Sequence, residues 1–186
     1  MSSVTFPPQF PQTLGTNYGY DNVVPPFYLN GAQITANLAA FPSLPIALYN
    51  TLEIRLWIAG LSGSDTVLIQ FNGDTGNNYW SRNVSMTAAS ALNTNVEVPS
   101  TSGINLGIAL TKGMFVRLFV GNFATQPKTV SGVGSIGTGA AGTIGVPLQI
   151  AGEWENTTAQ ISSVLVKLAG ANTILTGSSI QIFGGV

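Results

Sequence analysis

The sequence contains no cysteine and no histidine. Without cysteine, the chain has no disulfide framework, no thiolate metal site and no cysteine nucleophile. Without histidine, it lacks the commonest general base, the usual zinc ligand and the ordinary partner of a catalytic serine. These absences exclude most common enzyme and metal-site designs, so we expect a protein that is not an enzyme and holds no cofactor.

Charge is also scarce. Charged residues make up only 7% of the 186 residues, against about 25% in ordinary soluble domains. Six basic and seven acidic residues give a net charge of -1, which offers no electrostatic footprint for nucleic acid or an anionic membrane. A polar but nearly uncharged surface favours association with other proteins. We therefore expect a subunit of a larger assembly, with further copies of itself among its partners.

Long hydrophobic runs are missing as well. The most apolar stretch, 104–120, is interrupted by Lys112, Arg117 and two glycines, so no segment supplies the roughly 20 apolar residues that span a membrane. The first ten residues, MSSVTFPPQF, have neither the basic start nor the apolar core of a secretory signal. These features predict a protein that folds in the cytoplasm, where it is made.

Seven of the ten prolines lie within residues 1–45. Because proline cannot donate to a β-ladder and makes its predecessor extended, this region is predicted to be an extended N-terminal arm with one short strand near 33–36. Its aromatic residues predict docking, either on its own domain or on a neighbouring subunit. These anchors include Phe6, Phe10, Tyr18, Tyr20, Phe27 and Tyr28.

Short β-rich segments separated by turn residues fill the remainder, residues 46–186. We expect strands at 52–58, 66–71, 79–86, 95–98, 103–110, 113–120, 146–154, 159–168, 173–175 and 179–183, and one helical turn at 88–92. Many short strands with almost no helix predict an all-β antiparallel sandwich, with a jelly roll as the preferred form. The glycine-rich segment 130–145 is either a flexible surface loop or a weak strand pair with close backbone approach.

The segment TVLIQFNGDTGNNYW, residues 66–80, has the pattern of a strand, a turn and a second strand that restarts at Tyr79 and Trp80. Its turn offers oxygen ligands for Ca²⁺ from Asn72, Asp74, Asn77 and Asn78. Only one of these residues is charged, however, and their spacing does not fit an EF-hand. A structural turn is therefore the simpler interpretation.

Glu153 and Glu155 flank Trp154, and on a strand both carboxylates would project from one face, about 7 Å apart. Two carboxylates beside an aromatic ring are the residue types that a glycosidase active site uses. The simpler interpretation is a pair of solvated charges, because a glycosidase also needs one carboxyl group held protonated in a closed cleft.

Trp57, Trp80 and Trp154, together with Tyr79, form a candidate carbohydrate-stacking platform. The alternative is that these large aromatic side chains fill the core. Two glycosylation sequons begin at Asn83 and Asn156, but they matter only in a secretory pathway.

Two stretches resemble a widespread group of tailed-bacteriophage virion proteins. The first is IQFNGDTGNNYW, residues 69–80, and the second is GEWENTTAQISSVLVKLAGANTILTGSSIQIFG, residues 152–184. In that group a strand ends in FNGD-T/S-G-x-N-Y, and the chain closes with I-x-S-I/V and then GS-x-I-x-I-Y/F-G. The matching residues are Phe71, Asn72, Gly73, Asp74, Gly76, Asn78, Tyr79, Ile161, Ser163, Val164, Gly177, Ser178, Ile180, Ile182 and Gly184.

The resemblance covers the chain from about Tyr49 onward and implies a β-sandwich structural protein of the phage particle, with no catalytic residue. We expect a capsid decoration, or cement, protein. It would be a homo-oligomer, expected as a trimer, that binds the major capsid protein or other virion proteins and reinforces the head shell. The alternative is a tail or fibre domain that binds a host receptor or glycan.

Overall fold

The computed structural model describes the backbone of residues 21–29, 38–41, 49–86, 92–100, 103–109, 111–137 and 145–185. Side chains are described for residues 49–85, 103–109, 111–137 and 145–184. These parts form twelve strands and no helix: β1 (Asp21–Leu29), β2 (Leu38–Phe41), β3 (Thr51–Ile58), β4 (Asp65–Phe71), β5 (Tyr79–Met86), β6 (Leu92–Ser100), β7 (Ile104–Ala109), β8 (Met114–Gly121), β9 (Lys128–Ile136), β10 (Val146–Trp154), β11 (Val164–Leu168) and β12 (Ser178–Gly185).

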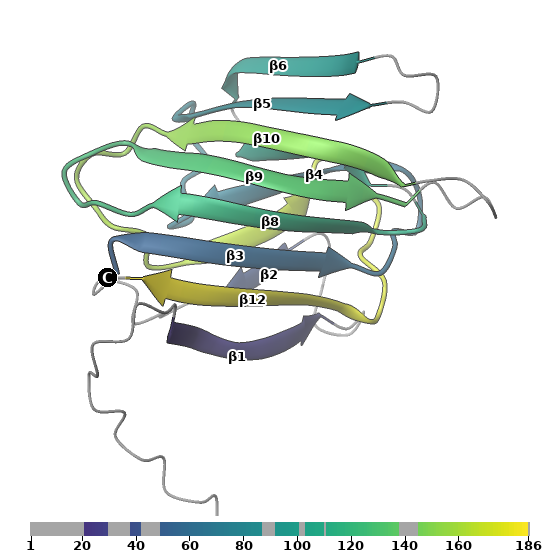
Figure 1. Cartoon of the computed structure of the whole chain (residues 1–186), viewed down its shortest axis with the longest axis horizontal. Helices are drawn as coiled ribbons and strands as arrows, with labels where there is room; N and C mark the ends of the chain where they lie inside the picture. The colour runs from purple at the N-terminus through teal and green to yellow at the C-terminus, as the bar shows by residue number, and fades with distance from the viewer. Residues whose placement is uncertain are drawn as a thin grey trace, which may run out of the picture.

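The strands form two antiparallel sheets that pack face to face (Figure 1). The larger sheet has eight strands in the order β1-β12-β3-β8-β9-β10-β5-β6, and the smaller has four in the order β2-β11-β4-β7. This arrangement confirms the predicted all-β, jelly-roll-like sandwich. The two sheets are unequal, and the larger one presents a broad outer face to the viewer in Figure 1.

Alternation along the strands builds the core between the sheets. In β3, for example, Leu52, Ile54, Leu56 and Ile58 are buried, while Arg55 and Trp57 are not. Such a period of two places one side-chain set in the core and the other on the outer face. The buried apolar residues of β8, β10, β4 and β11 join the same cluster: Met114, Val116, Leu118, Val120, Leu148, Ile150, Trp154, Val67, Ile69, Phe71, Val164, Val166 and Leu168.

Two strands lie in the proline-rich part of the chain. β1 is the outermost strand of the larger sheet, beside β12, and its register shifts between Val24 and Phe27, around Pro25 and Pro26. Prolines are tolerated there because an edge strand with a bulge does not need every N–H for the ladder. β2 is an edge strand of the smaller sheet. The strand predicted at 33–36 lies outside the described residues.

The glycine-rich segment is a strand over its first half. Residues 130–136 belong to β9, which pairs with β8 and β10. A Cβ atom at Gly132 would lie 2.6 Å from the carbonyl oxygen of Arg117, and one at Gly134 would meet the carbonyl oxygen of Phe115. The strand interpretation with close backbone approach is thus correct for these residues, and 138–144 lie outside the description.

Other predicted boundaries need correction. The expected strand 159–168 begins only at Val164, because side chains of Asn72 and Asn122 accept hydrogen bonds from the backbone of residues 161–163. Residues 173–175 form an isolated bridge through Ile174 to Leu61 instead of a strand. Of the predicted helical turn, 88–91 lie outside the described residues, and Leu92 begins β6.

Candidate docking surface

The outer face of the larger sheet carries a cluster of exposed aromatic side chains. Trp57 on β3 pairs in register with Phe115 on β8, and their ring centroids are 6.5 Å apart. Trp57 is 49% exposed, and Phe115 and Phe119 are also exposed. The strand β12 flanks β3 on the side opposite to β8, and its partly exposed Phe183 pairs with Glu53 of β3. Neighbouring strands therefore bring together aromatic residues that are far apart in the sequence.

Two arginines and one glutamate lie among these rings. Arg55 and Arg117 are directly opposite each other on β3 and β8, a pairing that like charges disfavour. The carboxylate of Glu53 resolves the conflict. It accepts hydrogen bonds from Arg55 Nε at 2.6 Å, from Arg117 Nε at 2.7 Å and from Arg117 Nη2 at 3.0 Å. The side chain of Glu53 is only 1% exposed, whereas each arginine is 42% exposed.

Each guanidinium also lies against an aromatic ring. Arg55 is 4.5 Å from the ring centroid of Phe183, and Arg117 is 4.7 Å from that of Phe119, within the range of cation–π contacts. These contacts and the shared carboxylate fix both arginine side chains. We call the set Glu53, Arg55, Trp57, Phe115, Arg117, Phe119 and Phe183 the aromatic–arginine patch.

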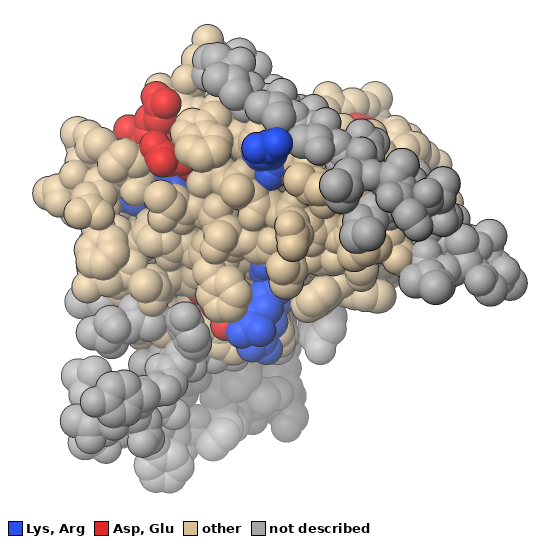
Figure 2. All heavy atoms as spheres, turned by 45° about the horizontal axis from the view of Figure 1, so that its top comes forward, with Lys and Arg blue, Asp and Glu red and all other residues tan. Residues whose placement is uncertain are grey.

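The ionisation of Glu53 sets the charge of this patch. Burial raises the pKa of Glu53, but the hydrogen bonds and positive charges of Arg117 and Arg55 outweigh burial and hold the pKa below its ordinary value of 4.5. Glu53 is therefore ionised at neutral pH, and the patch has a formal charge of +1. Figure 2 shows that charged atoms are sparse on the face it presents.

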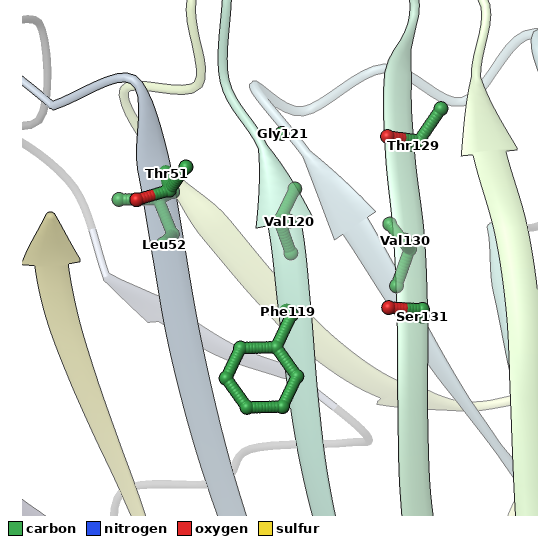
Figure 3. Close-up of a pocket in the computed structure, with 8 residues that line it drawn as sticks. All are labelled: Thr51, Leu52, Phe119, Val120, Gly121, Thr129, Val130 and Ser131. Carbon is green, nitrogen blue, oxygen red and sulfur yellow. The ribbon is translucent and has the colours of Figure 1, made fainter. Parts of the chain in front are cut away.

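A shallow hollow of about 210 Å³ adjoins the patch at the end of β3, β8 and β9 (Figure 3). It lies over Gly121, which has no side chain to fill the space between Thr51 and Thr129. Phe119 and Ser131 line it on the outer face, while Leu52, Val120 and Val130 lie behind the ribbon. The hollow thus offers hydroxyl groups beside one exposed aromatic ring.

The turn between β4 and β5 is structural. Asn72 and Gly73 adopt positive φ angles of 54° and 67°, which the short Asn side chain and glycine tolerate. The carboxylate of Asp74 accepts hydrogen bonds from Trp154 Nε1 at 2.7 Å, from Gly76 N at 2.8 Å and from Asn78 Nδ2 at 2.9 Å. These three hydrogen bonds give Asp74 a structural role within the turn. No cluster of three or more acidic residues within the described ranges could hold a metal ion.

Asn72 connects this turn to the segment before β11. Its side-chain oxygen accepts hydrogen bonds from Ser162 N at 2.7 Å and Ser163 N at 3.0 Å, and its amide donates to the carbonyl of Gln160 at 2.9 Å. Tyr79 is fully buried, and its hydroxyl bonds the backbone of Phe71. Asn72, Asp74 and Tyr79 therefore stabilise the sandwich rather than form an exposed site.

The three tryptophans do not form a common platform. Trp154 is buried against Phe71 and Tyr79, with ring centroids 5.8 and 6.1 Å away. Trp80 is partly exposed on β5 and pairs with Glu153 in β10. Trp57 is the exposed one, and it lies several strands away in the aromatic–arginine patch.

The two glutamates next to Trp154 lie at the end of β10. Glu153 is partly exposed and belongs to the strand, whereas Glu155 follows it and is exposed. Neither lines the hollow beside Phe119. This open position matches the interpretation of the pair as solvated charges.

The other candidate residues fall in different surroundings. Asn83 is buried, so its side chain points away from solvent, and Asn156 accepts hydrogen bonds from Thr158 N and Ala159 N. Phe27 and Tyr28 are in β1, whose backbone alone is described. Phe6, Phe10, Tyr18 and Tyr20 lie outside the described residues.

In comparisons with known proteins, no protein family, curated protein or solved structure matches this chain. Within the residues that the structure describes, no helix is long and apolar enough to cross a bilayer.

The sequence reasoning missed the aromatic–arginine patch, although a partial signal was present. Period-two alternation places Glu53, Arg55 and Trp57 on one face of their strand, and it does the same for Phe115, Arg117 and Phe119. What alternation does not supply is the pairing of β3 with β8 and β12. Only that register brings the two triplets and Phe183 together.

Proposed function

We propose that this protein is a structural component of a bacteriophage particle: a capsid decoration protein that binds the head shell and stabilises it. The observation that carries the protein-binding part is the aromatic–arginine patch. The assignment to a phage particle is supported by the two motifs that resemble tailed-phage virion proteins.

The composition of the patch suits a protein interface. Tryptophan, phenylalanine and arginine are enriched in the cores of interfaces, and tryptophan and arginine are frequent binding hot spots. In this patch both arginines are already held by Glu53 and by aromatic rings. Because their side chains are preorganised, binding a partner costs less conformational entropy.

The motif residues support the resemblance at the level of the fold. Asn72 and Asp74 tie the β4–β5 turn to the segments around Trp154 and Ser163. Such contacts specify a sandwich but not a partner. We therefore place the partner specificity in surface residues, above all in the patch, whose members other than Phe183 lie outside the motifs.

A second candidate function is glycan binding by a tail or fibre domain. It is favoured by the exposed Trp57 and by the hollow that Phe119 lines together with Thr129 and Ser131. Aromatic rings with neighbouring hydroxyls suit a sugar ring. The patch itself, with two arginines and one buried carboxylate, favours a protein partner.

Rebinding to phage heads that lack the protein tests the proposal. Purified protein is mixed with such heads, which are then sedimented and assayed for retention of DNA on heating. We expect the protein to sediment with the heads and to raise their resistance to heat. A Trp57→Ser/Phe119→Ser variant should bind less. The matched control is Ile108→Ser, because Ile108 is 53% exposed but lies on the smaller sheet.

Two results would contradict this proposal. One is a folded protein that ignores the heads but binds host cells or their glycans, which would move the function to adsorption. The other is head binding that Ile108→Ser abolishes and the patch variant leaves intact.

A further inference from the structure

The twenty residues before β1 have the chemistry of a ligand for an aromatic surface. Their sequence, MSSVTFPPQFPQTLGTNYGY, contains three prolines and four aromatic residues but no charged side chain. Pro8 and Pro11 have the spacing of a P-x-x-P motif. Proline-rich segments of this kind bind grooves lined by aromatic side chains, because their extended backbone is already ordered.

The aromatic–arginine patch has the complementary groups. Trp57 and Phe115 provide a pair of exposed rings, and Phe119 borders the hollow over Gly121. An extended proline-rich backbone has no internal hydrogen bonds, so its carbonyl groups are free to accept. Arg55, partly exposed beside the rings, is a suitable donor.

The position of Asp21, the first residue of β1, shows to which end of the sheet residues 1–20 are attached. Asp21 pairs with Gly184, and Gly184 pairs with Leu52. Asp21, Gly184 and Leu52 thus lie side by side across three neighbouring strands. They are at the end of the sheet where Gly121 lies, and Arg55 and Trp57 are farther along β3 toward its other end. Residues 1–20 are therefore attached to the larger sheet at this end. Twenty extended residues reach at most about 70 Å, far enough for an adjacent molecule.

We propose that residues 1–20 of a second copy of this chain occupy the aromatic–arginine patch. The proposal rests on the proposed use of the patch as a protein-docking surface and names the neighbouring copy as the direct occupant, so that weaker head binding by a patch variant would follow from loss of the oligomer. Each copy would then give its segment to one neighbour and accept that of another. Such a heterologous contact closes into a ring when the rotation permits, which suits the expected trimer.

Two complementary full-length variants test this proposal without any phage heads. The segment variant is Phe6→Ser/Phe10→Ser, and the patch variant is Trp57→Ser/Phe115→Ser. Masses are measured by light scattering over a range of concentrations, and thermal melts establish that each variant is folded. We expect the wild type to form an oligomer and each variant alone to remain a 19.3 kDa monomer. Ile108→Ser is the control and should behave like the wild type.

Mixing the two variants gives the decisive result. The patch variant still has a wild-type segment, and the segment variant still has a wild-type patch, so one interface can form. The mixture should therefore contain particles of twice the monomer mass. If the patch variant fails to fold, Phe119→Ser replaces it.

Three outcomes would overturn the proposal. A monomeric wild type would mean that the segment covers its own patch or does not dock. A segment variant with the wild-type mass would mean that copies join through another surface. A mixture that stays monomeric would mean that these two regions do not meet. Because no outcome involves heads, a failure here is distinguishable from a failure of the decoration function.

Discussion

Asp74 and Trp154 are joined by a hydrogen bond of 2.7 Å between the carboxylate and the indole N–H, although 80 residues separate them in the chain. The contact links the two stretches that resemble phage virion proteins, since Asp74 belongs to one and Trp154 to the other. In the same region Glu155 N donates to the carbonyl of Asn78 at 2.8 Å. The motifs therefore describe one structural unit in which a turn is fastened to the end of β10.

Replacing Asp74 by Asn should destabilise the protein. Trp154 Nε1 and Asn78 Nδ2 donate to the same carboxylate oxygen, so the asparagine oxygen can accept from both, but its NH₂ group would then face the donor Gly76 N. Loss of hydrogen bonds to a charged group typically costs about 1.5–3 kcal/mol. Urea unfolding should show this decrease in the free energy of unfolding. The exposed Glu155→Gln is the control, and an equal loss in both variants would contradict the role assigned to Asp74.

Stability should fall in acid. Burial raises the pKa of Asp74 and of Asp65, but hydrogen bonds from Trp154 and from Gly170 and Asn172, respectively, help hold both values below the ordinary 3.8. A carboxyl group whose pKa is lower in the folded state than in the unfolded state stabilises the folded protein. This contribution is complete at pH values above the unfolded-state pKa, and it is lost as the pH falls through the folded-state pKa. Unfolding free energies should therefore decrease below about pH 4. Asp74→Asn should reduce that acid dependence, and an unchanged slope would contradict this explanation.

Replacing Glu53 by Gln should weaken the larger sheet. The substitution removes the negative charge that offsets the repulsion between Arg55 and Arg117. It also leaves one acceptor oxygen for their hydrogen bonds instead of two. Because both arginines are partly exposed, we expect a loss of only about 1–3 kcal/mol. Chemical unfolding measures the loss. A more stable Glu53→Gln variant would show that burying the carboxylate costs more than its arginine contacts return.

Lys128 should resist chemical labelling in the folded protein. Its side chain is fully buried, and Nζ donates to the carbonyls of Gln126 and Asn156 at 2.6 and 2.7 Å. Burial lowers its pKa, which favours the reactive neutral amine, but reagents cannot reach it. Acetylation followed by mass spectrometry should modify Lys112 and Lys167 first and Lys128 only after unfolding. Early labelling of Lys128 would mean that the end of β9 opens readily.

Gly134 should not tolerate a larger residue. A Cβ at this position would meet the carbonyl oxygen of Phe115 and lie 3.1 Å from a methyl group of Val116. Gly134→Ala forces β8 and β9 apart, at a cost of about 1–3 kcal/mol. Thermal unfolding should show a lower midpoint. The neighbouring Ser135→Ala, on the exposed face of the same strand, should change the midpoint little.

The fold could be predicted because its signals are local. Alternation in segments such as Thr51–Ile58 and Met114–Gly121 specifies strands, and the scarcity of helix-forming patterns leaves a sandwich as the main solution. The strands β1 and β2 are not predicted by the proline-rich sequence of residues 1–45, and Pro25 and Pro26 fit β1 only because it is an edge strand.

The candidate site could not be predicted in the same way, because it depends on register between distant strands. Glu53 and Arg117 are 64 residues apart, and nothing local in either strand specifies the other as its neighbour. The strand prediction for residues 159–163 was wrong for a related reason. Its apolar residues suggest a strand, but the side chains of Asn72 and Asn122 hold its backbone in another shape.

Each of the last two strands in the sequence occupies an interior position in one of the two sheets. β11 lies between β2 and β4, and β12 lies between β1 and β3. Until these strands arrive, β1 and β2 have no hydrogen-bonding partner in the sheets. The pairings of β1 with β12 and of β2 with β11 therefore span most of the chain, and such long-range pairings slow folding. Shortening the chain from its C-terminal end should leave both early strands unattached, so this protein depends on late-synthesised residues to recruit its earliest ones.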